Sequence, residues 1–246
     1  MMHADGAIPH AHGARPWVLF DLDGTLFDYH RAETDAVASI LQSLGLPSGE
    51  DGLARYRRIN RDHWAALERG ETSAAQLRTQ RWSDLLAELA PHRGRTIDLE
   101  ALATGYLQQL AAGSHLLPGA EQVVAQLGRS HRIGFVTNGL ADVQRPRLAS
   151  SPLADAGEVV VVADEVGAAK PAAAFFDAAF AAMGQPRRSL VTIVGDSLSA
   201  DVAGGRAYGL TTVWVAPGTA TDPDDPALRP HHRIGTLEEL PALLGS

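Results

Sequence analysis

Residues 18–26 read VLFDLDGTL, in which apolar residues lead into two aspartates, a glycine and a threonine. The apolar run at residues 17–20 predicts a short buried strand. Because residues two apart in a strand point to the same side, Asp21 and Asp23 are expected to emerge together at its carboxyl end. Gly24 permits a sharp turn and a close approach to a ligand. Two adjacent carboxylates repel each other unless a cation or proton lies between them, and this arrangement suits a Mg2+ site with a nucleophilic carboxylate.

Three further segments carry polar residues that suit the same chemistry. Taken singly, each has an ordinary structural interpretation, because threonine, glycine and aspartate are frequent turn residues and Lys-Pro often begins a helix. Their occurrence in one order, with three of the four segments at strand ends, favours a functional site over coincidence. The segments are IGFVTNG at 133–139 with Thr137, DEVGAAKP at 164–171 with Lys170, and LVTIVGDS at 190–197 with Asp196, followed by Asp201.

Together the four segments resemble the four motifs of the haloacid dehalogenase-like (HAD) phosphohydrolase superfamily. The resemblance extends over nearly the whole chain from Trp17 onward. Within the superfamily the chain is most similar to the branch of pyrimidine 5'-nucleotidases and acylneuraminate-9-phosphatases. That closer similarity rests on VTNG at 136–139, GAAKP at 167–171, VGDSLSADVAGG at 194–205 and AYGLTTVWV at 207–215.

The resemblance implies a role for each matching residue. It implies Asp21 as the nucleophile that forms an aspartyl-phosphate, and Asp23 as the general acid and then base. Thr137 and Lys170 complete the implied catalytic set. The implied phosphate contacts are Asp21, Gly24, Thr137, Asn138 and Lys170. The implied Mg2+ ligands are Asp21, Asp23 through its backbone carbonyl, and Asp196, with Asp201 supporting the metal directly or through water.

Composition narrows the function classes further. The chain has 246 residues, 45% of them hydrophobic and 20% charged, with a formal net charge of -8 and no cysteine. The acidic balance argues against a nucleic-acid polymer as partner. The absence of cysteine excludes disulfides and thiolate chemistry. No apolar run is long enough to span a bilayer. These properties are compatible with a cytoplasmic enzyme that does not act at membranes. The family resemblance implies a small phosphate ester as the substrate, and we expect a monomer or homodimer.

Hydrophobic periodicity divides the chain into a tail, a split core and an insert. Helical spacing and helix end signals predominate at 28–115, where we expect a bundle of four to five helices. Strands and helices alternate afterwards, which predicts an α/β fold with a doubly wound parallel sheet, similar to a Rossmann fold. Pro146 weakens the helix expected at 141–148, and Pro171 is expected to open the next one. The predicted boundaries are a disordered tail at 1–15, a core at 16–27 plus 116–246, and a helical cap at 28–115.

These features predict a Mg2+-dependent phosphatase for a small phosphomonoester, such as a nucleoside 5'-monophosphate. The alternatives are a phosphatase for sugar phosphates or phosphoglycolate, a mutase that uses the same aspartate pair, a 2-haloacid dehalogenase, and an inactive scaffold. Asp23 argues against the dehalogenase, since the resemblance implies that those enzymes lack an aspartate there. Eight residues of the insert are candidates for contacting the leaving group of the substrate. For each of them, helical spacing favours packing in the bundle or exposure to solvent instead. These candidates are Tyr29, His30, Arg31, Asn60, His63, Trp64, Arg78 and Trp82.

Overall fold

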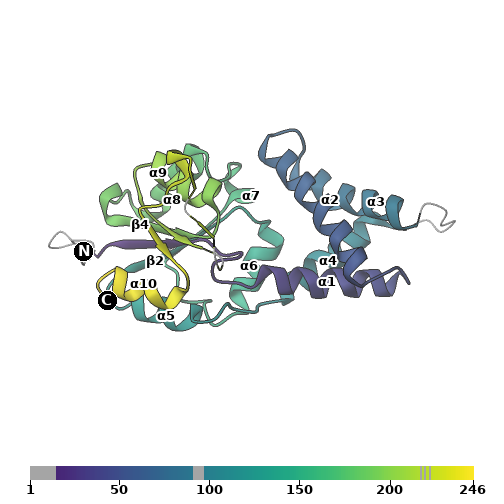
Figure 1. Ribbon diagram of the computed structural model, residues 1–246, viewed down its shortest axis with the longest axis horizontal. Helices are drawn as coiled ribbons and strands as arrows, with labels where there is room; N and C mark the ends of the chain where they lie inside the picture. Colours follow the sequence, from purple (N-terminus) through teal and green to yellow (C-terminus); the bar gives the residue numbers. More distant parts are fainter. Residues whose placement is uncertain (1–14, 91–96, 217, 219, 222) are drawn as a thin grey trace.

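The computed structural model describes residues 15–90, 97–216, 218, 220–221 and 223–246. It has two lobes, one built on a β-sheet and one made of helices (Figure 1). The predicted tail, residues 1–15, lies outside the described residues apart from Arg15, whose guanidinium donates to Gly128 O and His131 O at 2.6 Å. Within the described ranges, no helix combines the length and apolar character that a membrane span needs.

In the described part of the chain, six parallel strands form one sheet in the order β3-β2-β1-β4-β5-β6. The predicted doubly wound parallel sheet is therefore confirmed. β1 lies in the middle, paired with β2 on one side and β4 on the other. The strands are β1 (Trp17–Phe20), β2 (Arg132–Thr137), β3 (Val159–Val162), β4 (Val191–Gly195), β5 (Thr211–Val215) and β6 (His232–Ile234).

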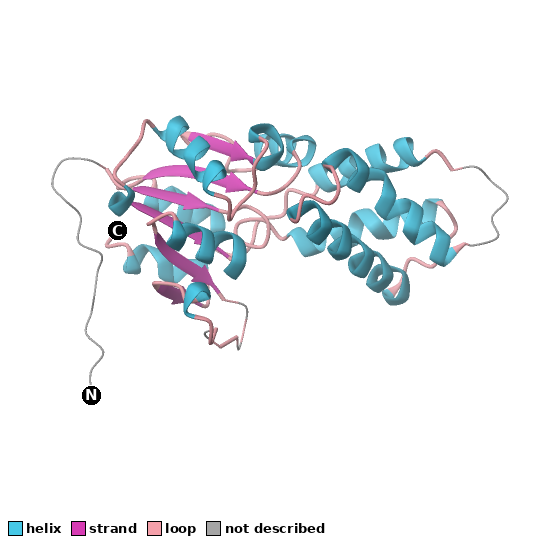
Figure 2. Ribbon diagram, turned by 90° about the horizontal axis from the view of Figure 1, so that it is seen from above, coloured by secondary structure: helices cyan, strands magenta, loops and turns pink. Residues whose placement is uncertain are grey.

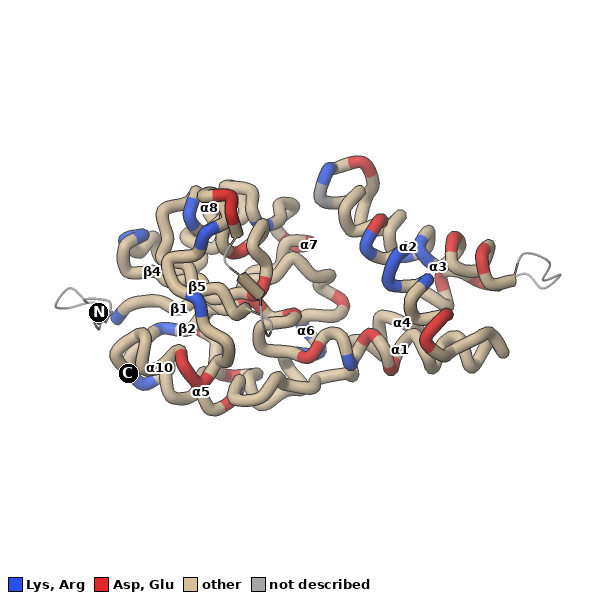
Figure 3. Tube along the Cα trace, in the orientation of Figure 1, with Lys and Arg blue, Asp and Glu red and all other residues tan. Residues whose placement is uncertain are grey.

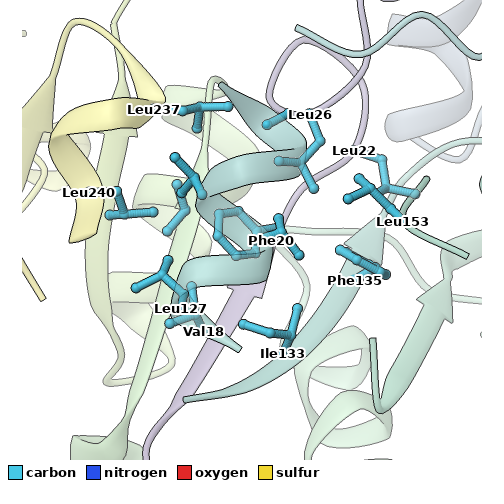
Figure 4. Close-up of a cluster of buried hydrophobic side chains, with 14 of the residues drawn as sticks. Val18, Phe20, Leu22, Leu26, Leu127, Ile133, Phe135, Leu153, Leu237 and Leu240 are labelled. Carbon is cyan, nitrogen blue, oxygen red and sulfur yellow. The ribbon is translucent and has the colours of Figure 1, made fainter. Parts of the chain in front are cut away.

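One face of the sheet packs against helices α5 (Ala120–Leu127) and α10 (Leu240–Leu243). Val18 and Phe20 of β1 point to this face, as the two-residue period of a strand requires. Figure 4 shows both side chains inside this cluster, with Leu127 near them. Both are fully buried, and burial of a side chain of this size contributes about 1.5–3 kcal/mol.

The opposite face packs against α8 (Ala173–Met183), so helices lie on both sides of the sheet (Figure 2). Trp17 and Leu19 point to this side and contact the cluster that contains Phe175 and Phe176. Burial on both faces explains why β1 is a continuous apolar run rather than an alternating one.

The helical lobe consists of α1 (Tyr29–Ser43), α2 (Glu50–Glu68), α3 (Ala74–Leu89) and α4 (Leu99–Ala112). Side chains cap three of these helices: Asp28 accepts from Arg31 N, Ser73 from Gln76 N, and Asp98 from Ala101 N. The lobe has its own core, in which Tyr56, Trp82 and Tyr106 pack with ring centroids 5.1 to 5.7 Å apart.

The two connections between the lobes run side by side. Asp28 N donates to His115 O at 2.8 Å, and Leu117 N donates to Leu26 O at 2.8 Å. These contacts lie where the sequence predicted the boundaries of a cap at 28–115, and the assignment of that segment as a separate domain stays a prediction. Acidic and basic residues are interspersed over both lobes (Figure 3).

Helix α6 (Ala141–Ala149) joins the two lobes by packing. It follows β2 in the chain but packs against α4, and Leu140 and Val143 belong to the apolar core of the helical lobe. Pro146 does not end it. The helix continues although proline has no N–H to donate to the carbonyl of Asp142, one turn earlier.

One local expectation was wrong. Pro171 does not open a helix: α8 begins at Ala173, two residues after the cis Lys170-Pro171 peptide bond. The segment that follows β4 is helical, with a wide π-type turn, η2 (Leu198–Ala203), that continues into α9 (Gly204–Ala207). The remaining short elements are α7 (Ala163–Val166), η1 (Arg188–Leu190), η3 (Pro226–Leu228) and η4 (Leu237–Glu239).

Candidate active site

Three neighbouring strands bring the predicted polar residues to one edge of the sheet. Asp21 follows β1, Thr137 ends β2 and Asp196 follows β4. Strand order reverses around β1, and ligands of open α/β sheets bind in the crevice at such a point. A cavity of about 270 Å³ opens there, and both Lys170 and Asp201 line it with these three residues.

Lys170 stands at the base of this cavity. Its Nζ donates to Asp21 Oδ1 and to Asp201 Oδ1, both at 2.7 Å, and to Val136 O at 2.9 Å. Burial alone would lower the pKa of Lys170, but the two carboxylates outweigh it and raise that pKa above its usual range. The amine is therefore a fixed positive charge next to Asp21.

Three carboxylates crowd around this single ammonium group. Oxygen atoms of Asp21, Asp196 and Asp201 all lie within 4.8 Å of one another. Burial, and then the charges of Asp201 and Asp196, raise the pKa of Asp21 despite Lys170. Partial burial of the carboxylate, and then the negative charge of Asp201, raise the pKa of Asp196 to about 6. The residue still reaches solvent at the edge of the cavity. One lysine does not neutralise three carboxylates, so the donor set fits a hard divalent cation such as Mg2+.

Asp201 is already bonded through both carboxylate oxygens. Oδ1 accepts from Lys170, and Oδ2 accepts from Ser197 N at 3.1 Å. The carboxylate is almost fully buried. These bonds fit the supporting role predicted for Asp201, whereas Asp196 keeps its carboxylate at the mouth of the cavity.

The turn after β1 brings Asp21 and Asp196 together. Gly24 has a φ of +82°, and a Cβ at this position would overlap the Asp196 carboxylate. Thr25, which the sequence analysis left without a role, donates through Oγ1 to Asp21 Oδ2 at 3.3 Å. The Gly24 N–H donates to Phe27 O at 2.9 Å, so its predicted phosphate contact stays a prediction.

Thr137 and Asn138 occupy the end of β2. The Thr137 hydroxyl accepts from Gly139 N at 3.0 Å, which leaves its own proton for a ligand oxygen. The Asn138 side chain donates to Lys170 O and accepts from Lys170 N, both at 2.8 Å. Asn138 therefore fixes the segment that carries Lys170, and its predicted phosphate contact stays a prediction.

Asp23 points into the same cavity and is held by helix α6. Gln144 Nε2 donates to Asp23 Oδ2 at 2.6 Å, and Arg147 Nη2 donates to Asp23 Oδ1. Neither partner was predicted from the sequence. The available signal was a glutamine and an arginine three positions apart, on one helix face directly after the second motif.

Three of the eight candidates for contacting the leaving group line the cavity: Tyr29, Asn60 and Trp64. Asn60 is held by Arg81 Nη1 at 3.0 Å and by Glu33 Oε1 at 3.2 Å. The other candidates behave as packed or solvated residues. Trp82 is buried in the core of the lobe, His63 pairs with Asp84, Arg78 pairs with Asp142 and Asp164, and His30 and Arg31 are exposed.

A second cavity of about 760 Å³ adjoins the first, and Trp64 lines both. Leu67 and Ala74 line it from the helical lobe, and Ala168 and Pro171 line it from the sheet lobe. The first cavity is therefore lined by charged side chains, and the adjoining space is mainly apolar.

The sequence is similar to those of known hydrolases. A family model for haloacid dehalogenase-like hydrolases matches residues 16–209. The HAD-hydrolase YfnB of Bacillus subtilis is 32% identical over 223 residues, which cover 91% of this chain and 92% of YfnB. The pyrimidine 5'-nucleotidase YjjG of Escherichia coli is 30% identical over 228 residues, which cover 93% of this chain and 97% of YjjG.

Solved structures give the same answer for the fold. A crystal structure of Bacillus subtilis YfnB bound to magnesium has a TM-score of 0.83 and 31% identity, and covers 95% of this chain and 100% of that chain. A dehalogenase structure has a TM-score of 0.70 at 20% identity, covering 96% of this chain and 100% of that chain, and it supports the fold alone. The matched family model, the 32% identity to YfnB and the shared fold show that this chain belongs to the haloacid dehalogenase-like hydrolase family.

Proposed function

We propose that this hydrolase is a Mg2+-dependent phosphomonoesterase that works through a phosphorylated Asp21. The observation that carries the proposal is the position of Lys170 Nζ, 2.7 Å from both Asp21 and Asp201, in a cavity that Asp23 and Asp196 also line. A protein catalyses phosphoryl transfer mainly by positioning the reacting groups and by neutralising their charge.

In the first step, a carboxylate oxygen of Asp21 forms a bond to phosphorus while the bond to the ester oxygen breaks. The leaving oxygen keeps the bonding electrons and takes a proton from Asp23. Lys170 and the Thr137 hydroxyl stabilise the oxygens of the group in transfer, since both are fixed before the substrate arrives.

In the second step, Asp23 removes a proton from a water molecule whose oxygen attacks phosphorus. The bond to Asp21 breaks, and inorganic phosphate leaves. Splitting hydrolysis into two displacements lowers each barrier. A bound divalent cation would neutralise charge on Asp21 and on the phosphate oxygens, and Asp21, Asp196 and the Asp23 carbonyl would hold it.

The proposed substrate is a nucleoside 5'-monophosphate. Two curated relatives, YjjG of Escherichia coli and PynA of Streptococcus pneumoniae, are pyrimidine 5'-nucleotidases, at 30% and 31% identity. A cavity of about 760 Å³ lies within the size range of pockets for small ligands. Trp64 lines both cavities, and we propose that the base of the nucleotide stacks on its indole ring.

We expect Trp64→Ala to raise KM for thymidine 5'-monophosphate about tenfold with a smaller change in kcat, because a lost stacking contact removes about 1–3 kcal/mol of binding. Steady-state phosphate release with Mg2+ measures both constants. Trp82→Phe is the matched control and should leave KM unchanged, since Trp82 is buried away from both cavities.

The same assay separates the alternative functions. The panel adds glycolate phosphate, sugar phosphates and 2-chloropropionate to the nucleotides. Preference for a sugar phosphate with an unchanged KM in Trp64→Ala would replace the nucleotide proposal. Halide release without phosphate release would establish the dehalogenase reading. We also propose that the protein is cytoplasmic, that it is a monomer or homodimer, and that residues 28–115 form a cap.

A further inference from the structure

The structure assigns to Gln144 and Arg147 of α6 the role of positioning Asp23 for proton transfer, an inference that rests on the proposed function. Gln144 Nε2 donates to Asp23 Oδ2 at 2.6 Å, and Arg147 Nη2 donates to Asp23 Oδ1. The same Nη2 donates to Gln144 Oε1 at 2.8 Å. The three side chains therefore form a closed ring of hydrogen bonds.

This arrangement is buried on the helix side and open on the cavity side. Arg147 is fully buried and Gln144 nearly so, whereas the Asp23 side chain is 26% exposed and lines the cavity. Each carboxylate oxygen can accept a second hydrogen bond. The ring therefore fixes the direction of Asp23 and leaves it free to meet a leaving oxygen or a water molecule.

Arg147 has few other partners to explain its burial. Its guanidinium lies 4.7 Å from the centre of the Phe27 ring, and among the described residues Nε and Nη1 have no hydrogen-bond partner. A buried charge is costly unless it is paired, and Asp23 is the carboxylate that pairs it. A residue that served only to stabilise α6 would not need a charged group there.

The second motif also makes room for this ring. A Cβ at Gly139 would overlap Gln144 Nε2, so glycine at this position lets the glutamine side chain pass. Leu140 and Val143 fix the same helix against the helical lobe. Gln144 is thereby held from two sides, and its amide reaches Asp23 across the turn after β2.

The test compares two substrates that differ in their need for a proton. p-Nitrophenyl phosphate releases a weakly basic phenolate, whereas thymidine 5'-monophosphate releases a strongly basic alkoxide. The ratio kcat/KM reports the steps up to phosphorylation of Asp21. We expect Asp23→Asn, Gln144→Met and Arg147→Met each to lower kcat/KM for the nucleotide by about tenfold more than for p-nitrophenyl phosphate, because only the nucleotide depends on the acid.

Arg145→Met is the matched control, because Arg145 lies on the same helix but pairs at the surface with Glu165. It should leave kcat/KM unchanged for both substrates. Arg147→Lys keeps the charge and should recover part of the selective loss. If Arg147→Met does not fold, Gln144→Met decides, since it retains the length of the side chain.

Equal losses on both substrates in Gln144→Met, alongside a selective loss in Asp23→Asn, would overturn the positioning role alone. An Asp23→Asn variant without a selective loss would remove the acid and the positioning role together. A wild-type protein that hydrolyses neither substrate with Mg2+ would instead count against the proposed function.

Discussion

Asp21→Asn is expected to lower phosphate release by at least about a thousandfold, because the amide cannot form the acyl phosphate on which both steps depend. The change also removes the carboxylate that accepts from Lys170 Nζ. The measurement is kcat for thymidine 5'-monophosphate and for p-nitrophenyl phosphate, with the thermal midpoint recorded to show that the variant folds.

Asp155→Asn provides the control, because Asp155 is an exposed aspartate of the same lobe. It should retain full turnover. An Asp21→Asn protein that folds and keeps more than about a tenth of the wild-type kcat would show that another residue attacks phosphorus or that water attacks directly.

Removal of divalent cations with EDTA is expected to abolish turnover, and added Mg2+ should restore it. Three carboxylates within 4.8 Å of one another repel an anionic ester unless a cation changes the local charge. Phosphate release before and after chelation measures the effect, with Asp196→Asn as a variant that should need much more Mg2+. Undiminished turnover in EDTA would contradict the assigned metal site.

The same titration should depend on pH in one direction. The pKa of Asp196 is raised to about 6, so below pH 6 a proton occupies a group that the cation needs ionised. Protonation therefore competes with Mg2+, and the Mg2+ concentration for half-maximal activity should rise roughly tenfold per pH unit below pH 6 for one displaced proton. It should be nearly constant above pH 7, and a constant value from pH 5 to 8 would contradict this competition.

The part of the site that lies at the strand ends could be predicted from the sequence. Asp21, Thr137 and Asp196 each follow or end an apolar run, and a parallel sheet brings the carboxyl ends of its strands to one edge. Lys170 is different, since its segment is a loop whose place is fixed by Asn138. The family resemblance suggested its role, whereas local pattern alone does not distinguish it from a solvated lysine.

Helix α6 shows where prediction from sequence ends. Pro146 drew attention to a weak helix, but the function of the segment depends on Gln144 and Arg147, which meet a residue 121 and 124 positions earlier in the chain. Trp64 and Trp82 give a second example. Both fit helical spacing, and only the packing of four helices places one at the cavities and the other in a core.

The central claim is that the side chain of Asp21 itself carries the phosphoryl group. Borohydride reduces an acyl phosphate to the alcohol, which converts a phosphorylated aspartate into homoserine. After a rapid quench of the wild-type protein with thymidine 5'-monophosphate and Mg2+, peptide mass spectrometry should find homoserine at position 21, and only when substrate is present. Continued turnover with no homoserine at position 21, or with homoserine at another aspartate, would contradict the account.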